Sequence, residues 1–71
     1  MTLGQSIKLH RNRAGLTQQA LADKSGVSRS HLAAVEIGAY LPSLKLLEKI
    51  SRPCGCSPID FFDGVDYAHS R

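Results

Sequence analysis

The sequence predicts an all-α fold, a compact bundle of four to five short helices. Apolar residues recur every three or four positions, as they do along one face of a helix. Valine, isoleucine and threonine are sparse and never alternate with polar residues, so strands are not expected. Glycine and proline residues interrupt the chain at intervals of about one short helix: Gly15, Gly26, Gly38, Pro42, Pro53, Gly55, Pro58 and Gly64.

The first helix is expected from about Leu3 to Arg13. Thr2 suits its N-cap, because a side-chain oxygen there can accept a backbone N–H of the first turn. Gly15 suits the left-handed position at its end. Four residues fall at helical spacing on its inward side: Leu3, Ile7, His10 and Ala14.

The second helix is expected from Gln18 to Ser25, with Thr17 as its N-cap and Gly26 at its end. The third begins directly afterwards, with Ser28 as its N-cap, and runs to about Ile37, before Gly38. The residues expected to lock the two helices together are apolar: Leu21, Ala22, Val27, Leu32 and Val35.

Two short helices joined by so tight a turn form a helix-turn-helix, at about residues 17–37, in which the second helix can enter the major groove of DNA. Small side chains on its outer face allow close approach to base edges, and the exposed N–H groups of its first turn favour phosphate. That face offers Arg29, Ser30, His31, Ala33 and Ala34.

The fourth helix is expected from Ser43 to Arg52, before Pro53, with an apolar stripe of Leu44, Leu47 and Ile50. A fifth, short turn begins at Ser57-Pro58, because proline is favoured at the first helical position. It carries Ile59, Phe61 and Phe62. The domain is therefore placed at residues 1–64, and residues 65–71 are expected to form a flexible C-terminal tail.

Charge is distributed unevenly along the 71 residues, which carry a net charge of +3. Eight of the nine basic residues and three of the six acidic ones precede Pro53, so residues 1–52 carry +5 and residues 53–71 carry −2. A small basic body suits a polyanionic partner such as nucleic acid. A chain this short excludes a two-domain enzyme with its active site in an interdomain cleft.

No set of residues in the sequence points to catalysis or to a cofactor. There is no Ser/His/Asp set, no phosphate-binding glycine loop and no convergent carboxylate pair, so we expect a protein that is not an enzyme. Cys54 and Cys56 lack further ligands nearby, so core filling is favoured over a metal or redox site. The absence of a secretory signal or a long apolar stretch predicts a cytoplasmic protein without membrane association.

The helix-turn-helix segment resembles the Cro/phage-repressor type of helix-turn-helix family, also called the xenobiotic-response-element (XRE) type. The resemblance covers nearly the whole chain and implies a lambda-repressor-like domain that binds double-stranded DNA as a small transcriptional regulator. It rests on Gly15-Leu16-Thr17-Gln18, Leu21-Ala22, Gly26-Val27-Ser28, Glu36, Pro42-Ser43-Leu44 and Ile50.

The resemblance implies a role for individual residues. Arg11 and Glu36 would form a structural salt bridge between the first helix and the end of the third. Contacts to DNA phosphates or bases would come from Gln18, Ser28, Arg29, Ser30 and Ala34. From the residues themselves, His31 could contact DNA or only water, and Tyr40 could donate a hydrogen bond to a phosphate. Residues 37–42 lack the basic residues that the family commonly has there, which predicts weaker binding by the monomer and a shallower salt dependence.

One module of this size offers too few contacts for specific DNA binding at physiological salt, so a homodimer is expected. Its interface is predicted to use Ile59, Phe61 and Phe62, which are more apolar bulk than the monomer needs. The alternative is a protein-interaction module of the same fold, such as an antitoxin that binds a toxin. That alternative is based on apolar residues where cations are expected: Leu9, Ile37, Tyr40 and Leu41.

Overall fold

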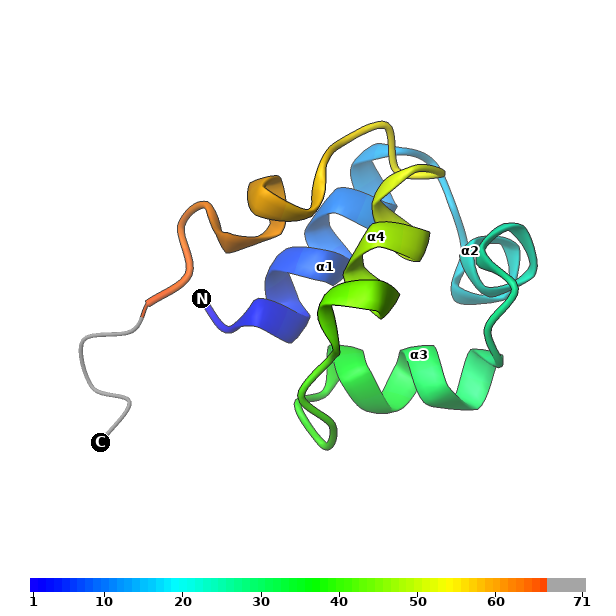
Figure 1. The fold of residues 1–71 in the computed structure, drawn as a ribbon, viewed down its shortest axis with the longest axis horizontal. Helices are drawn as coiled ribbons and strands as arrows, with labels where there is room; N and C mark the ends of the chain where they lie inside the picture. The colour runs from blue at the N-terminus through cyan, green and yellow to red at the C-terminus, as the bar shows by residue number, and fades with distance from the viewer. Residues whose placement is uncertain (67–71) are drawn as a thin grey trace.

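Figure 1 shows the computed structural model, in which residues 1–66 are described. Among these residues there are four α-helices, one 3-10 helix and no strand, so the predicted all-α fold is confirmed. None of these helices is long and apolar enough to cross a membrane. The elements are α1 (Leu3–Arg13), α2 (Gln18–Ser25), α3 (Arg29–Glu36), α4 (Leu44–Ser51) and η1 (Pro58–Phe62).

A hydroxyl side chain fixes the start of each α-helix, as predicted for the first three; Ser43, predicted as the first residue of the fourth helix, is its N-cap. Thr2, Thr17, Ser28 and Ser43 each accept a hydrogen bond at 3.0–3.1 Å from the backbone N–H three residues further on. Helices of 8 to 11 residues are too short to persist alone in water. Each cap contributes about 1 kcal/mol, which favours helix formation from these residues over starts one or two positions away.

The turn between α2 and α3 depends on a single glycine. Gly26 has φ +72°, in the left-handed region that side chains with a Cβ disfavour. In this conformation the N–H groups of Gly26 and Val27 both donate to the carbonyl oxygen of Ala22, which completes the end of α2. The chain therefore turns sharply within three residues, 26–28, and begins α3 at Arg29.

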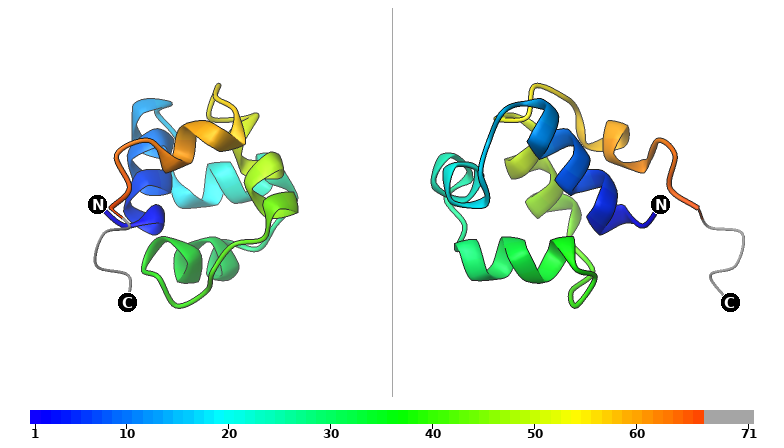
Figure 2. Two further views of the ribbon diagram at one scale, coloured as in Figure 1. Left: turned by 60° about the vertical axis from the view of Figure 1, so that its left-hand side comes forward. Right: turned by 180° about the vertical axis from the view of Figure 1, so that it is seen from behind.

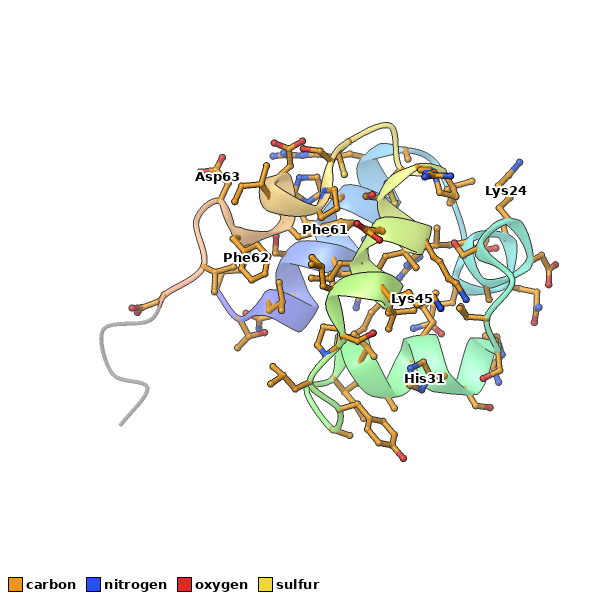
Figure 3. All side chains as sticks on the ribbon, viewed as in Figure 1. Lys24, His31, Lys45, Phe61, Phe62 and Asp63 are labelled. Carbon is orange, nitrogen blue, oxygen red and sulfur yellow. The ribbon has the colours of Figure 1, made fainter. Side chains whose placement is uncertain are left out.

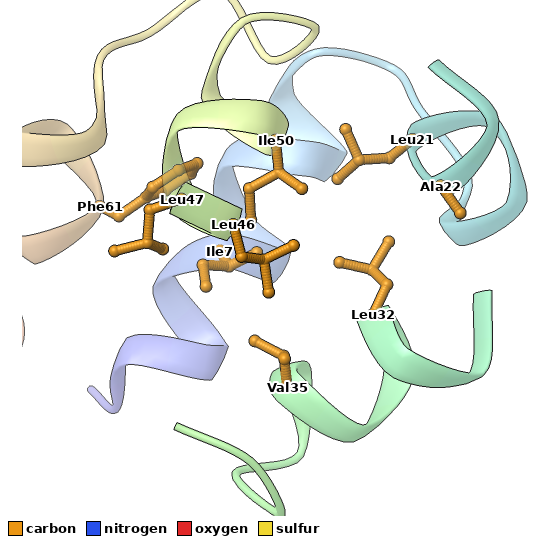
Figure 4. Packing of buried hydrophobic residues seen from close by; sticks show 9 residues of the cluster. All are labelled: Ile7, Leu21, Ala22, Leu32, Val35, Leu46, Leu47, Ile50 and Phe61. Atoms are coloured by element: carbon orange, nitrogen blue, oxygen red, sulfur yellow. The ribbon is translucent and has the colours of Figure 1, made fainter. Parts of the chain in front are cut away.

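All five helical elements contribute to one core (Figure 4). In Figure 1 and in both views of Figure 2, α3 lies along one edge of the molecule, so it can bury one side and leave the other open. The buried hydrophobic residues are Ile7, Leu21, Ala22, Leu32, Val35, Leu46, Leu47, Ile50 and Phe61.

Two residues predicted to face inward are exposed. Leu44 is 66% exposed, and Leu46 is buried in its place. At about 100° per residue, Leu44 lies about 110° from the centre of the face that Leu46, Leu47 and Ile50 bury. Ala14 is exposed because it follows the last residue of α1 as the C-cap and no longer continues the buried face.

Phe61 is not available for a dimer interface, so this part of the prediction is wrong. Its side chain is fully buried, and the ring meets the ring of His10 edge-on at 5.2 Å. Part of the apolar surface of η1 is thus buried in the chain's own core. Phe62 is partly buried against that core, whereas Ile59 is 72% exposed.

The segment after η1 returns to the N-terminus. The backbone N–H of Val65 donates to Phe62, and that of Asp66 donates to the carbonyl oxygen of Met1 at 3.0 Å. Residues 65 and 66 were predicted to belong to a flexible tail, but this hydrogen bond places Asp66 beside the N-terminus. Residues 67–71 of the predicted tail lie outside the described residues.

Gly4 permits the close approach of α1 to the end of α3, which the sequence did not reveal. A Cβ at this position would lie 2.5 Å from the carbonyl oxygen of Val35 and closer still to that of Glu36. Side-chain carbons do not approach backbone oxygens so closely, and neither oxygen can move without moving α3. The position of α3 therefore requires glycine at residue 4.

Gly4→Ala should lower the free energy of unfolding by about 1–3 kcal/mol, because the added methyl group overpacks the contact between α1 and α3. Urea denaturation checks this, with Lys8→Ala, an exposed change in the same helix, as the control. Helix propensity alone favours alanine by about 1 kcal/mol. A more stable Gly4→Ala protein would therefore contradict the proposed close contact.

Candidate nucleic-acid interface

The inner face of α3 holds this helix mainly against α1 and α2. Leu32 and Val35 are buried in the core, and Glu36 is buried at the helix end. These three side chains leave the rest of the helix surface without a covering element. The orientation of the open face is thus determined by how α3 is anchored.

The open face of α3 carries the residues that the sequence predicts for DNA contact. At about 100° per residue, Ser30 and Ala34 point away from the buried side. Arg29 and Ala33 lie along one edge, and His31 lies along the other. Arg29, Ser30 and His31 are exposed, so none is required by the core. The short side chains of Ser30 and Ala34 leave room for a base edge to approach the helix backbone.

A buried ion pair anchors the end of α3, as predicted. The Nε of Arg11 donates to Glu36 Oε2 at 2.7 Å, and its Nη2 donates to Oε1 at 3.1 Å. The remaining Nη1 donates to the carbonyl oxygen of Leu16 at 2.9 Å, in the turn before α2. The two side chains are 8% and 2% exposed. Desolvation offsets much of the Coulomb attraction in such a pair, so its main effect is to fix the position of α3.

Gln18 also belongs to this network. Its Nε2 donates to Glu36 Oε1 at 3.0 Å, so the first residue of α2 is joined to the last residue of α3. Sequence reasoning assigned Gln18 only a phosphate contact and missed this bond. The amide group carries a second N–H, and the side chain is partly exposed, so an external acceptor remains within its capacity.

Tyr40 lies beside the open face of α3. Its ring centroid is 5.3 Å from that of His31, with the two rings tilted by 44°. Figure 3 shows His31 on the surface of α3, and Tyr40 is 59% exposed. The phenol of the loop and the imidazole of α3 thus lie together, where sequence reasoning considered them separately. The ring pair lies on the edge of α3 opposite to Arg29.

Comparison with known proteins agrees with this arrangement. The helix-turn-helix family HTH_3 matches residues 7–61. The chain belongs to the Cro/phage-repressor type of helix-turn-helix family. The matched residues include all of α2, α3 and α4 and most of α1.

Three relatives illustrate the similarity of this helix-turn-helix protein to known regulators. The immunity repressor protein of Bacillus phage phi105 is 47% identical over 55 residues, covering 78% of this chain and 38% of the repressor. An uncharacterized HTH-type transcriptional regulator of Methanothermobacter thermautotrophicus is 44% identical over 54 residues, covering 76% of this chain and 78% of its own length. SlrR of Bacillus subtilis is 37% identical over 70 residues, covering 97% of this chain and 46% of SlrR. The chain thus spans less than half of two of these three relatives.

Solved structures share the fold. The restriction-modification controller protein C.AhdI of Aeromonas hydrophila has a TM-score of 0.81 at 33% identity, covering 84% of this chain and 91% of C.AhdI. SinR, a master regulator for biofilm formation solved in complex with DNA, has a TM-score of 0.82 at 35% identity, covering 87% of this chain and all of the SinR chain.

The two cysteines follow α4 and do not belong to the open face of α3. Both are partly buried and pack against the core. Burial, with a smaller contribution from the neighbouring Cys56, raises the pKa of the Cys54 thiol to about 11. A thiol with so high a pKa is a poor nucleophile and metal ligand near neutral pH. Within residues 1–66 no group of three or more histidine, cysteine or acidic side chains could hold a metal ion.

Glu36→Ala should destabilise the fold by about 3–5 kcal/mol, because Arg11 would be left buried without its partner. Thermal and urea denaturation measure the loss. The matched control is the double variant Arg11→Met with Glu36→Leu, which removes both charges and should recover most of the stability lost in Glu36→Leu alone. Equal stability of Glu36→Ala and the parent would contradict a structural role for this pair.

Cys54 should react slowly with iodoacetamide at pH 8 in the folded protein. A pKa about two units higher than in the unfolded chain leaves about a hundredfold less thiolate, which is the reactive form. Because the folded pKa is the higher one, this thiol favours folding below about pH 9 and loses that effect as the pH rises through about 11. The alkylation rate of Cys56→Ser, measured with and without urea, isolates Cys54. Equal rates in the two conditions would show that its thiol is not protected.

Proposed function

We propose that this chain binds double-stranded DNA sequence-specifically as a homodimer and regulates transcription by occupying an operator. The observation that carries this proposal is the open face of α3, which is held in place by the network of Arg11, Gln18 and Glu36. Arg29 and Ser30 are exposed in the first turn of this anchored helix, so both side chains are available to a ligand.

Each side of α3 can serve a different part of a DNA duplex. With α3 in the major groove, Ser30 and Ala34 face the bases, and Arg29 at the first turn reaches a base edge or a phosphate. Gln18 and the N-terminus of α2 lie toward one edge of the helix, and the pair of His31 and Tyr40 lies at the other. The protein could therefore contact phosphates on both sides of the groove.

The distribution of charge favours DNA as the partner but limits the affinity of one copy. Residues 1–52 carry +5, yet no cation lies in residues 37–44, next to the recognition helix. Few phosphate contacts mean weak binding by a single copy. Two copies on half-sites about one helical turn, roughly 34 Å, apart would combine their contacts.

The relatives favour a repressor or controller. The phi105 protein is named an immunity repressor, C.AhdI a restriction-modification controller, and SinR was solved in complex with DNA. None of these names describes an enzyme. We therefore propose regulation by occupancy of DNA, with no catalytic step.

A protein partner is the second candidate, and the exposed apolar side chains after α3 favour it. Ile37 is 82% exposed and Leu41 is 89% exposed. SinR has also been solved in a complex with the protein SinI. An antitoxin that covers a toxin could use such a surface. Binding to random duplex DNA separates the candidates, because a pure interaction module would show no salt-dependent signal.

Arg29→Ala should weaken binding to a duplex selected from a random DNA pool at least tenfold, while its melting temperature stays within about 2 °C of the parent. Fluorescence anisotropy at several salt concentrations measures the binding. Lys24→Ala is the matched control, because it removes the same charge from a side chain that points away from α3 in Figure 3. Equal losses in the two variants would mean that only net charge matters, and a large fall in melting temperature would mean that Arg29 is structural.

A further inference from the structure

The exposed apolar side chains of this protein are concentrated in one segment. Among the described residues, six large hydrophobic side chains are exposed, and four of them lie in residues 37–44. They form what we call the loop patch: Ile37, Tyr40, Leu41 and Leu44. Isolated exposed leucines are common, but four within eight residues require an explanation.

The loop patch borders an apolar groove. The groove lies between the start of α1 and the loop, and Leu3, Val35, Gly38, Tyr40, Leu41 and Pro42 contribute to its lining. Residues 37–44 contain no aspartate, glutamate, lysine, arginine or histidine. A covering partner would therefore bury apolar surface there without removing a charge from water.

The other exposed apolar residues lie beside charges. Ile59 on η1 is next to Asp60 and close to Asp63, with which it lines the same surface hollow. The backbone N–H and the hydroxyl of Ser57 both bond Asp60 and hold its pKa below the usual range, so this carboxylate stays ionised. Met1 carries the N-terminal ammonium and lines a hollow with Lys8.

In a symmetric dimer, the charges beside each exposed apolar surface decide which surface can pair with its own copy. A two-fold interface sets each residue near its own copy, so charged residues near the axis meet charges of the same sign. Two η1 surfaces would bring together at least four carboxylates, whereas the four side chains of the loop patch carry no charge and the first charged residue beside them is Lys45. We propose that the loop patch is the surface on which a second copy of this chain docks. The inference rests on the proposed function, because it specifies how the DNA-bound dimer is made.

The position of the patch connects dimerisation to recognition. Ile37 is the C-cap of α3, and Tyr40 contacts His31 on the same helix. In Figures 1 and 2 the loop between α3 and α4 lies away from η1. Docking through it turns the C-terminal ends of the two α3 helices toward the two-fold axis. The first turns, with Arg29 and Ser30, then contact the outer parts of the two half-sites.

The size of the patch limits the strength of this dimer. A stable interface buries about 800 Å² on each partner, a large share of the 4496 Å² of accessible surface of this chain. Such an interface uses about 20–30 residues on each partner, and residues 37–44 are only eight. We therefore expect a reversible monomer–dimer equilibrium in solution, which binding of both copies to adjacent half-sites shifts toward the dimer.

Sedimentation equilibrium of the full chain from micromolar to millimolar concentration tests the proposal. Leu41→Gln should shift the dissociation constant of the dimer at least tenfold upward, and Ile37→Gln should do the same. Ile59→Gln is the matched control, since it places the same polar side chain on the exposed η1 surface, and it should leave the equilibrium unchanged. Circular dichroism melts establish that each variant is folded.

Two results would overturn the proposal. One is a parent protein that stays monomeric over the whole concentration range, which would mean that the loop patch binds a different partner. The other is a dimer weakened as much by Ile59→Gln as by Leu41→Gln, which would move the interface to η1. Anisotropy with random duplex DNA, run on the same samples, keeps the proposed function separate. DNA binding by a strictly monomeric parent would support DNA binding and contradict the loop interface. A loop-dependent dimer that does not bind DNA would support the loop interface and contradict the proposed function.

Discussion

The buried ion pair between Arg11 and Glu36 fixes where α3 lies, and the function of the molecule depends on that position. Arg11 contributes from α1, Glu36 from the end of α3, and the network extends to Gln18 on α2 and to the turn at Leu16. Its geometry therefore constrains three helices at once. A hydrophobic contact could supply similar stability, and the directional hydrogen bonds add a constraint on the rotation of this short helix.

Rotation of α3 matters because eight residues expose only one narrow face. Gly4 brings α1 against the end of this helix, and the N-cap at Ser28 determines where the helix begins. With both ends fixed, Ser30 and Ala34 point outward together. Such preorganisation lowers the entropy lost on binding, since the contacting groups do not have to be ordered by the ligand.

The surface beside α3 differs from the open face of the helix. An apolar loop without cations follows the recognition helix, and the carboxylates of Asp60 and Asp63 lie on η1. Under the proposed function, a single copy would make few phosphate contacts, and a second copy would supply additional affinity. The loop that limits the DNA contacts of one copy would then also be the uncharged surface on which two copies associate.

The sequence by itself determined the order and approximate bounds of the helices, the helix-turn-helix and the exposure of Arg29, Ser30 and His31. These follow from local physics: hydroxyl caps, a left-handed glycine and apolar spacing act within a few residues of one another. The ion pair was accessible only through the resemblance to a known family. Tertiary structure alone decided that Phe61 belongs to the core, that Leu46 rather than Leu44 is buried, and that Gly4 and Gln18 contact the end of α3. Those outcomes depend on which surfaces meet across elements distant in sequence, and periodicity along a single helix does not encode that.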